Sequence, residues 1–134
     1  MAGVRIIRAS ERSMATSQTT NMRREAAIEP EAGAAGPQLW MGLVTTPAGG
    51  ISGWHHHGEC VSGIYVASGR ARFNWGPGGA ESAEVGPGDF LAVEPGAIHQ
   101  EQALGDEPLV LVVARGAAGT LVVNTDGPEP ERAR

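Results

Sequence analysis

The sequence has no lysine, and this absence limits the partners that the chain can have. All ten of its basic residues are arginines, and the formal net charge is −5. Between Gly36 and Gly127 there are only three arginines against nine acidic residues. Domains that bind DNA or RNA carry a basic surface. We therefore expect no nucleic-acid partner.

Cysteine and long hydrophobic runs are scarce as well. The single cysteine, Cys60, cannot form a disulfide within the chain, which favours a reducing compartment, the cytoplasm. The longest apolar run, Pro108 to Ala114, is far shorter than the roughly 20 residues of a membrane-spanning helix. We expect no membrane partner. The absence of lysine also indicates the arginine-favouring codon usage of a GC-rich bacterial genome.

Glycine and proline are abundant, with 20 and 9 residues, and they divide the chain at short intervals. The segments between these turns are rich in valine, leucine, isoleucine and aromatic residues and are too short for ordinary helices. Nine such strands at this spacing predict an all-β sandwich or closed barrel. The expected strands are 38–46, 51–57, 62–67, 70–75, 80–85, 89–93, 98–103, 109–115 and 120–124.

The two ends of the chain differ in composition from the segment between them. Residues 1–37 are rich in Ala, Ser, Thr, Glu and Arg, with breaks at Pro30 and Gly33. We expect a flexible leader there, with at most one short helix near Met22 to Glu29. The folded domain is expected to span residues 38–127, followed by a loose tail over 128–134.

All four histidines lie in two short segments. Because side chains alternate along a strand, His55 and His57 are expected to share one face while His56 points to the other. His99 follows a Pro-Gly turn that can direct its side chain inward. Two interpretations remain open at this point: a solvated histidine run, or part of a metal site.

The spacing of these residues resembles the motifs of the cupin superfamily, small barrels known as double-stranded β-helices. In the first cupin motif four positions match, and Ser62 occupies the place of the usual glutamate: Gly49, His55, His57 and Gly69. In the second motif three positions match, with Glu94 in a proline place and Ala103 in an asparagine place: Gly88, Gly96 and His99.

This resemblance implies a single jelly-roll barrel that holds one divalent transition metal ion through His55, His57 and His99. The candidate ions are Fe(II) or Zn, then Ni, Mn and Cu, and imidazole ligands suit Zn, Fe, Ni and Cu. With Ser62 in place of the glutamate, three neutral imidazoles leave the site near a charge of +2. Such an ion is a stronger Lewis acid toward an anionic substrate or a bound water.

Other side chains are candidates for the missing carboxylate or for neighbouring positions. Glu101 lies two residues after His99, so it is expected on the same inward face, as a fourth ligand or a catalytic general base. Glu59 follows a turn, where a solvated carboxylate is the simpler interpretation. Cys60 is either an inert buried thiol or, like Ser62, a group close to the metal.

The resemblance implies a metal-dependent enzyme that acts on a small organic molecule, with a non-haem metal dioxygenase as the leading reaction class. One alternative is a zinc-type enzyme that catalyses isomerisation, elimination or rearrangement. The other is a non-catalytic module that binds a metal or small ligand. A homodimer is expected, because a small barrel has a sheet edge to cover and cupins commonly pair. No organic cofactor is expected.

Overall fold

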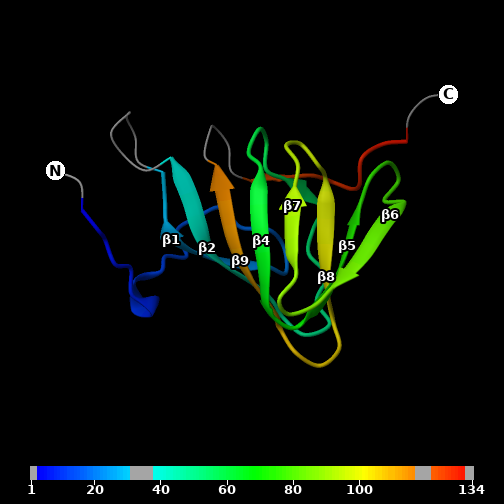
Figure 1. Ribbon diagram of the computed structural model, residues 1–134. Helices are drawn as coiled ribbons and strands as arrows, with labels where there is room; N and C mark the ends of the chain where they lie inside the picture. The colour runs from blue at the N-terminus through cyan, green and yellow to red at the C-terminus, as the bar shows by residue number, and fades with distance from the viewer. Residues whose placement is uncertain (1–2, 31–37, 117–121, 132–134) are drawn as a thin grey trace.

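The computed structural model describes residues 3–30, 38–116 and 122–131, and these residues form two antiparallel five-stranded sheets (Figure 1). The strand order is β1-β2-β9-β4-β7 in the first sheet and β10-β3-β8-β5-β6 in the second. A short 3-10 helix, η1 (Ala9–Glu11), precedes the strands. The strands are β1 (Arg23–Ile28), β2 (Leu39–Thr46), β3 (His55–His56), β4 (Ser62–Ser68), β5 (Arg70–Trp75), β6 (Glu81–Val85), β7 (Phe90–Val93), β8 (His99–Leu104), β9 (Leu109–Gly116) and β10 (Val123–Asn124).

Alternating burial along the strands builds the core between the two sheets. On β9, Leu109, Leu111 and Val113 are buried, while the residues between them are half-buried on the outer face. Period-two burial of this kind is what a sheet with one face on the core requires. The core cluster is Ala26, Trp40, Val44, Ile64, Val66, Ala71, Phe73, Val93, Ala103, Leu109, Leu111 and Val113.

The prediction of an all-β barrel is confirmed, and each of the nine expected segments overlaps an observed strand. The segment 51–57 is regular only at His55–His56, because Ser52 and Gly53 hydrogen-bond to Glu101 and to Thr20. The expected strand 120–124 is observed at Val123–Asn124, while residues 120 and 121 lie outside the described residues. No helix in the described ranges is long and apolar enough to cross a membrane.

The helix expected near Met22 to Glu29 is wrong, because Arg23–Ile28 forms β1. This strand pairs with β2 along its length, with Arg24 opposite Val44. Tertiary pairing outweighs local helix propensity here, since a short isolated helix gains little in water. Residues just before β1 also pack on the barrel, where Gly53 N–H donates to the Thr20 carbonyl oxygen at 3.1 Å.

The domain boundaries at residues 38 and 127 stay predictions. The expected break at Gly33 lies outside the described residues, as do 132–134 of the expected tail. What the structure adds is a strand of the first sheet, β1, upstream of the expected domain start.

Candidate metal centre

Three histidines meet inside the barrel. His55 on β3 is the register partner of His99 on β8, and the two ring centroids lie 4.3 Å apart. The His57 ring centroid is 5.1 Å from that of His55 and 5.2 Å from that of His99. One nitrogen from each ring lies within 4.8 Å of the other two, and all three side chains are buried. The predicted grouping is therefore confirmed as a geometric cluster.

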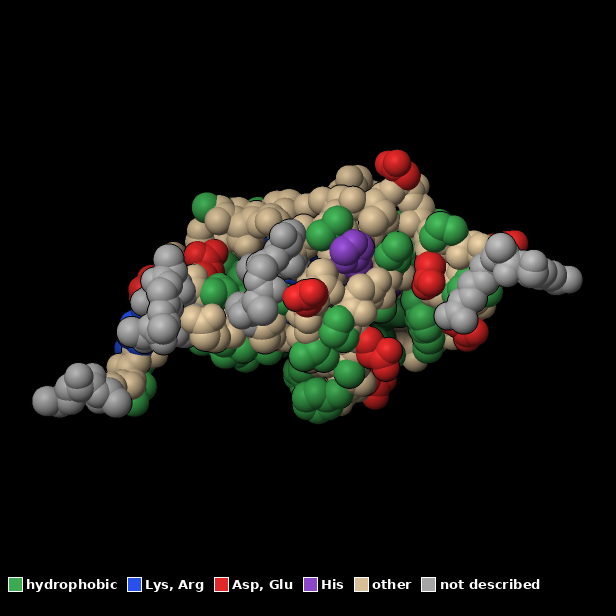
Figure 2. Space-filling model, turned by 90° about the horizontal axis from the view of Figure 1, so that it is seen from above, with side chains coloured by type: hydrophobic (Ala, Val, Ile, Leu, Met, Phe, Trp, Pro, Cys, Tyr) green, Lys and Arg blue, Asp and Glu red, His purple; other side chains and the backbone are tan. Residues whose placement is uncertain are grey.

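His56 takes the opposite face, as the alternation along the strand predicts. Its ring is half-buried, and its Nδ1 accepts a hydrogen bond from Gly58 N–H at 3.0 Å. Figure 2 shows histidine atoms at the surface of the molecule in the view from above. His56 thus stabilises the turn that follows the histidine run.

Two glycine turns hold the histidine segments together. Gly58 follows His57 with a φ of 58°, and Gly96 precedes His99 with a φ of 74°. Glycine adopts positive φ at little cost, whereas other residues are strained there. Gly96 N–H donates to the Gly58 carbonyl oxygen at 2.8 Å. The turns that carry the two ends of the cluster are therefore linked directly.

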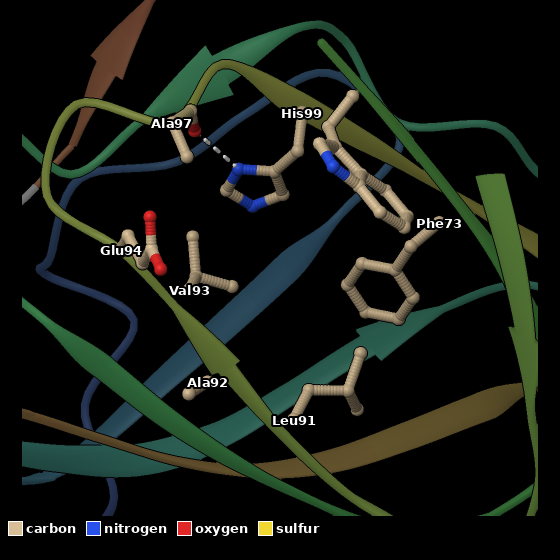
Figure 3. Close-up of a pocket in the computed structure, with 8 residues that line it drawn as sticks. Phe73, Leu91, Ala92, Val93, Glu94, Ala97 and His99 are labelled. Atoms are coloured by element: carbon tan, nitrogen blue, oxygen red, sulfur yellow. Dashed lines mark hydrogen bonds between the residues drawn. The ribbon is translucent and has the colours of Figure 1, made fainter. Parts of the chain in front are cut away.

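Backbone carbonyls fix the tautomer of two of the rings. His55 Nδ1 lies 2.9 Å from the Gly53 oxygen, and His99 Nδ1 lies 2.8 Å from the Ala97 oxygen, the latter drawn in Figure 3. A carbonyl oxygen only accepts, so the proton of each neutral ring is on Nδ1 and the lone pair is on Nε2. Both Nε2 atoms are buried and without a hydrogen-bond partner. This is the arrangement in which imidazole binds a metal ion.

The rings of His55 and His99 are neutral at neutral pH. Burial, with smaller effects of His99 and Arg24, lowers the pKa of His55 to about 2. Burial also lowers the pKa of His99 to about 4, although its hydrogen bond to the Ala97 oxygen opposes the shift. Neutral imidazoles are the form that coordinates metals, because no proton has to leave first.

Glu101 lies beside the cluster on the predicted inward face. Its carboxylate Oε1 is 3.7 Å from His99 Nε2, and Ser52 hydrogen-bonds its backbone on both sides. Glu101 is outside the group whose ligand atoms all lie within 4.8 Å of one another. Burial raises its pKa to about 7, against the opposing charges of Arg24 and Arg115. The carboxyl group is placed to hold or move a proton next to the histidines.

The three neighbours proposed from the sequence have different positions. Glu59 is exposed in the turn after Gly58, as a solvated carboxylate would be. The Cys60 side chain is buried and forms no disulfide within the described residues, and its N–H donates to the His57 oxygen at 3.0 Å. Ser62 is fully buried and accepts a hydrogen bond from Arg115 Nε at 3.1 Å. Neither Glu59 nor Cys60 joins the described metal-ligand group.

Sequence reasoning missed two buried arginines, Arg24 and Arg115. Arg115 continues the inward alternation of Leu109, Leu111 and Val113 on β9, so its burial could have been read from that pattern. Arg24 lies on β1, a strand that the composition of the first residues did not predict. Burial lowers the pKa of Arg115 to about 9 and also lowers that of Arg24, and both cations lower the histidine pKa values.

A pocket of about 270 Å³ opens next to His99 (Figure 3). Most of its walls are apolar, and one carboxylate, that of Glu94, stands at its border. A largely apolar cleft beside a few convergent polar groups is typical of a small-molecule site. The lining residues are Phe73, Trp75, Leu91, Ala92, Val93, Glu94, Ala97 and His99.

Two facing antiparallel sheets with a three-histidine cluster between them define a double-stranded β-helix with an interior candidate site. The family model of the cupin domain matches residues 42–115, more than half of the chain, and the protein belongs to the cupin family. This confirms the resemblance that the histidine spacing indicated. No curated protein matches the sequence.

Solved structures share this fold at low sequence identity. A Klebsiella pneumoniae protein with a double-stranded β-helix domain is 18% identical at a TM-score of 0.68, covering 92% of this chain and 99% of its own. The polyketide cyclase RemF of Streptomyces resistomycificus is 17% identical at a TM-score of 0.71, covering 94% and 90%. Oxalate decarboxylase of Bacillus subtilis, which has Mn(II) centres, is 22% identical at 0.66, covering 86% and 30%. These likenesses show the fold.

Proposed function

We propose that this cupin is a metal-dependent enzyme that acts on a small organic molecule. The observation that carries the proposal is the buried pair of Nε2 lone pairs on His55 and His99, together with His57 at ligand spacing. Leaving buried acceptors unpaired costs free energy, and a cation held between them removes that cost. The donor set therefore fits a divalent transition metal.

The chemistry of the ligands limits the choice of ion. Three imidazole ligands suit Fe(II), Zn, Ni or Cu and leave open coordination positions, and Mn would draw on oxygen ligands as well. The Mn(II) centres of the Bacillus subtilis relative support a metal in a barrel of this fold. A bound ion here would supply Lewis acidity and positions for substrate.

The residues of this chain have separate roles in such a reaction. The carbonyl oxygens of Gly53 and Ala97 keep His55 and His99 in the coordinating tautomer. The carboxyl of Glu101, 3.7 Å from His99 Nε2, gives or takes a proton at the reacting centre. The apolar walls contributed by Phe73 and Val93 exclude water from a substrate bound beside His99.

The position of Glu101 favours non-redox proton-transfer chemistry, such as isomerisation, elimination or rearrangement. A buried carboxyl next to the ligand cluster has no clear use in electron transfer, but it is what a general acid or base requires. Oxygenation is the second candidate, because three histidines leave room for both substrate and O₂. A cyclase and a decarboxylase among proteins of similar fold support the first candidate.

Elemental analysis of the untagged protein, purified anaerobically without chelators, tests the proposal. We expect near-stoichiometric metal in the unchanged protein and in His56→Ala, and loss of metal in His99→Ala. Zinc would support the proton-transfer class, while iron with substrate-dependent oxygen uptake would support oxygenation. No metal in any of the three proteins, or equal metal in His99→Ala, would overturn the metal assignment.

A further inference from the structure

The interior of the barrel contains two arginines that the metal centre does not use. Arg24 is 0% exposed and Arg115 is 3% exposed. Both stand on the first sheet, Arg24 on β1 and Arg115 on β9, with their side chains turned into the barrel. The histidines stand on the second sheet, on β8 and in and just after β3. Cations from one sheet and metal-ligand groups from the other therefore share one interior.

Within the described residues, neutral groups lie against Arg115, while the charge of Glu101 acts on it without forming an ion pair. Its Nε donates to the Ser62 hydroxyl at 3.1 Å, and its guanidinium carbon lies 4.8 Å from the centre of the Trp40 ring. Its Nη1 is buried and has no hydrogen-bond partner. A guanidinium has five N–H donors in a planar fork, and the donors on Nη1 of this one have no acceptor.

Arg24 has the same kind of surroundings. Its Nη1 donates to the Thr19 hydroxyl at 2.8 Å and approaches the Ser17 carbonyl oxygen at 3.4 Å, while Nε is buried without a partner. Thr19 in turn donates to Asn124 Oδ1 at 2.8 Å, and Asn124 is the register partner of His55. These contacts link Arg24 to Asn124 on β10, the strand that pairs with β3 at His55.

The acidic side chains of the interior do not balance these two cations. Within the described residues, no ion pair joins Arg24 or Arg115 to a carboxylate. Glu101 is the one buried acidic residue there, and its Oε2 has no partner either. The charge of Glu101 acts on both arginines, so one carboxyl faces two buried cations. Burying a cation without a matching anion costs free energy, and a metal ion would add further positive charge. A second anion in this interior would relieve the excess of positive charge.

We propose that Arg24 and Arg115 bind the carboxylate of a small organic acid, which is the ligand of this site. The inference deepens the proposed function by naming the substrate class, and it rests on that function only for the reaction. The unpartnered Nη1 of Arg115 and the unpartnered Nε of Arg24 are donors that carboxylate oxygens can accept from. The pocket beside His99 is walled by Phe73, Trp75 and Leu91, and neither arginine lines it. In this proposal the pocket takes the apolar remainder of the acid, while the carboxylate reaches the arginines deeper in the barrel.

Phenylacetate and its neutral isostere phenylacetamide are the probes. Binding is measured by isothermal titration calorimetry on the protein as purified and after removal of metal by chelation. We expect phenylacetate to bind at least about tenfold more tightly than the amide in both forms, since charged hydrogen bonds carry that much affinity. Equal affinity for acid and amide, or no binding of phenylacetate, would overturn the inference.

Variants separate the arginines from a carboxylate that merely binds the metal. Arg24→Gln and Arg115→Gln should each lose about tenfold or more of the preference for the acid in the metal-free protein. Arg72→Gln is the matched control, because Arg72 is half-buried at the outer surface near Glu84. Arg115→Lys keeps the charge and replaces Arg115→Gln in the experiment if the glutamine variant does not fold. Arg115→Lys should weaken binding of the acid less than Arg24→Gln does. An unchanged preference in Arg24→Gln and in a folded Arg115 variant would contradict the assignment.

The metal content of each sample keeps the two proposals distinguishable. Acid binding that survives in a protein with no metal under any preparation would overturn the proposed metal enzyme and leave the arginine site standing. Full metal content with no preference for the acid would overturn the arginine site alone.

Discussion

Ser62 and Arg115 are register partners on β4 and β9, and the serine hydroxyl accepts a hydrogen bond from Arg115 Nε at 3.1 Å. Ser62 occupies the place of the glutamate in the cupin motif. A glutamate there would bring a negative charge next to Arg115, whereas the serine satisfies one N–H and leaves the cation unneutralised. The departure from the motif and the buried arginine are therefore parts of one arrangement.

Replacing Ser62 by alanine should destabilise the protein. Arg115 Nε would lose its acceptor in a fully buried position, which costs about 1–3 kcal/mol. Urea unfolding of the metal-free protein measures the change. Ser68→Ala, at the exposed end of β4, is the control and should stay within about 0.5 kcal/mol. A loss in Ser62→Ala no larger than in this control would show that the hydrogen bond contributes nothing.

Gly96→Ala should weaken the metal centre through the backbone. A Cβ at Gly96 meets no atom within 4 Å, so the expected cost of about 1–2 kcal/mol comes from the φ of 74° alone. The same strain shifts the turn before His99 and should lower metal affinity. Gly127→Ala, equally open and without positive φ, is the matched control. Thermal unfolding measures the loss of stability, and metal titration measures the loss of affinity. Identical stability and metal affinity in Gly96→Ala and Gly127→Ala would refute the role of the positive φ at Gly96.

The metal-free protein should lose stability in mild acid. Below pH 6.5 the unfolded chain protonates His55 and His99, whereas the folded chain does so only near pH 2 and 4. Glu101 acts in the opposite sense: its folded pKa of about 7 lies above the ordinary 4.5, so the stability it contributes at low pH is lost as pH rises between these values.

The net slope follows from these three groups. Between pH 5 and 6 the unfolded state holds nearly two protons on the histidines that the folded state lacks, and the folded state holds about one on Glu101 that the unfolded state lacks. The free energy of unfolding should therefore fall by roughly 1.4 kcal/mol per pH unit as pH decreases. Glu101→Gln removes the opposing group and should about double this slope in urea unfolding across the range. A slope unchanged by Glu101→Gln would show that this carboxyl titrates normally.

Glu101→Gln also tests the proton-transfer role once a substrate is found. The amide cannot exchange a proton, so turnover should fall by about 10²-fold or more while metal content stays the same. Loss of metal together with turnover would instead mark Glu101 as a ligand. Full activity would leave the carboxyl a structural role.

A chain that starts at residue 38 should not fold stably, although the composition predicts a domain start there. Such a chain lacks β1 and so exposes the edge of β2 that pairs with β1, including the backbone at Val44. Exposed strand edges promote aggregation. Gel filtration and circular dichroism of chains starting at residues 38 and 13 compare the two boundaries. A monomeric, cooperatively unfolding chain from residue 38 would support the sequence-based boundary.

Much of the barrel could be predicted because turn residues and strand periodicity are local signals. A glycine directly follows β4, β5, β6 and β8, and the alternation of His55, His56 and His57 sets which rings point inward. The same parity placed Glu101 beside His99. Local rules sufficed wherever a residue's environment depended on its own strand.

The parts that could not be predicted depend on pairing between distant segments. β1 forms because β2 offers a free edge, and nothing within residues 23–28 indicates that partner. Arg24 becomes an interior residue only through this pairing. Arg24 contacts Thr19, which in turn contacts Asn124, a residue 105 positions further along the chain than Thr19.

The isolated bridge between Ser13 and Ala26 lies against β1, at the end of the first sheet. Ser13 N–H donates to the Ala26 oxygen, and Ala26 N–H donates to the Ser13 oxygen, each at 2.8 Å. At this point the sheet's outermost hydrogen-bonding groups are satisfied by the chain's own early residues. The need to shield an open edge, one of two reasons for expecting a homodimer, is thus reduced at β1 without a second copy. We therefore expect a homodimer to form at another edge, such as that of β7 or β6.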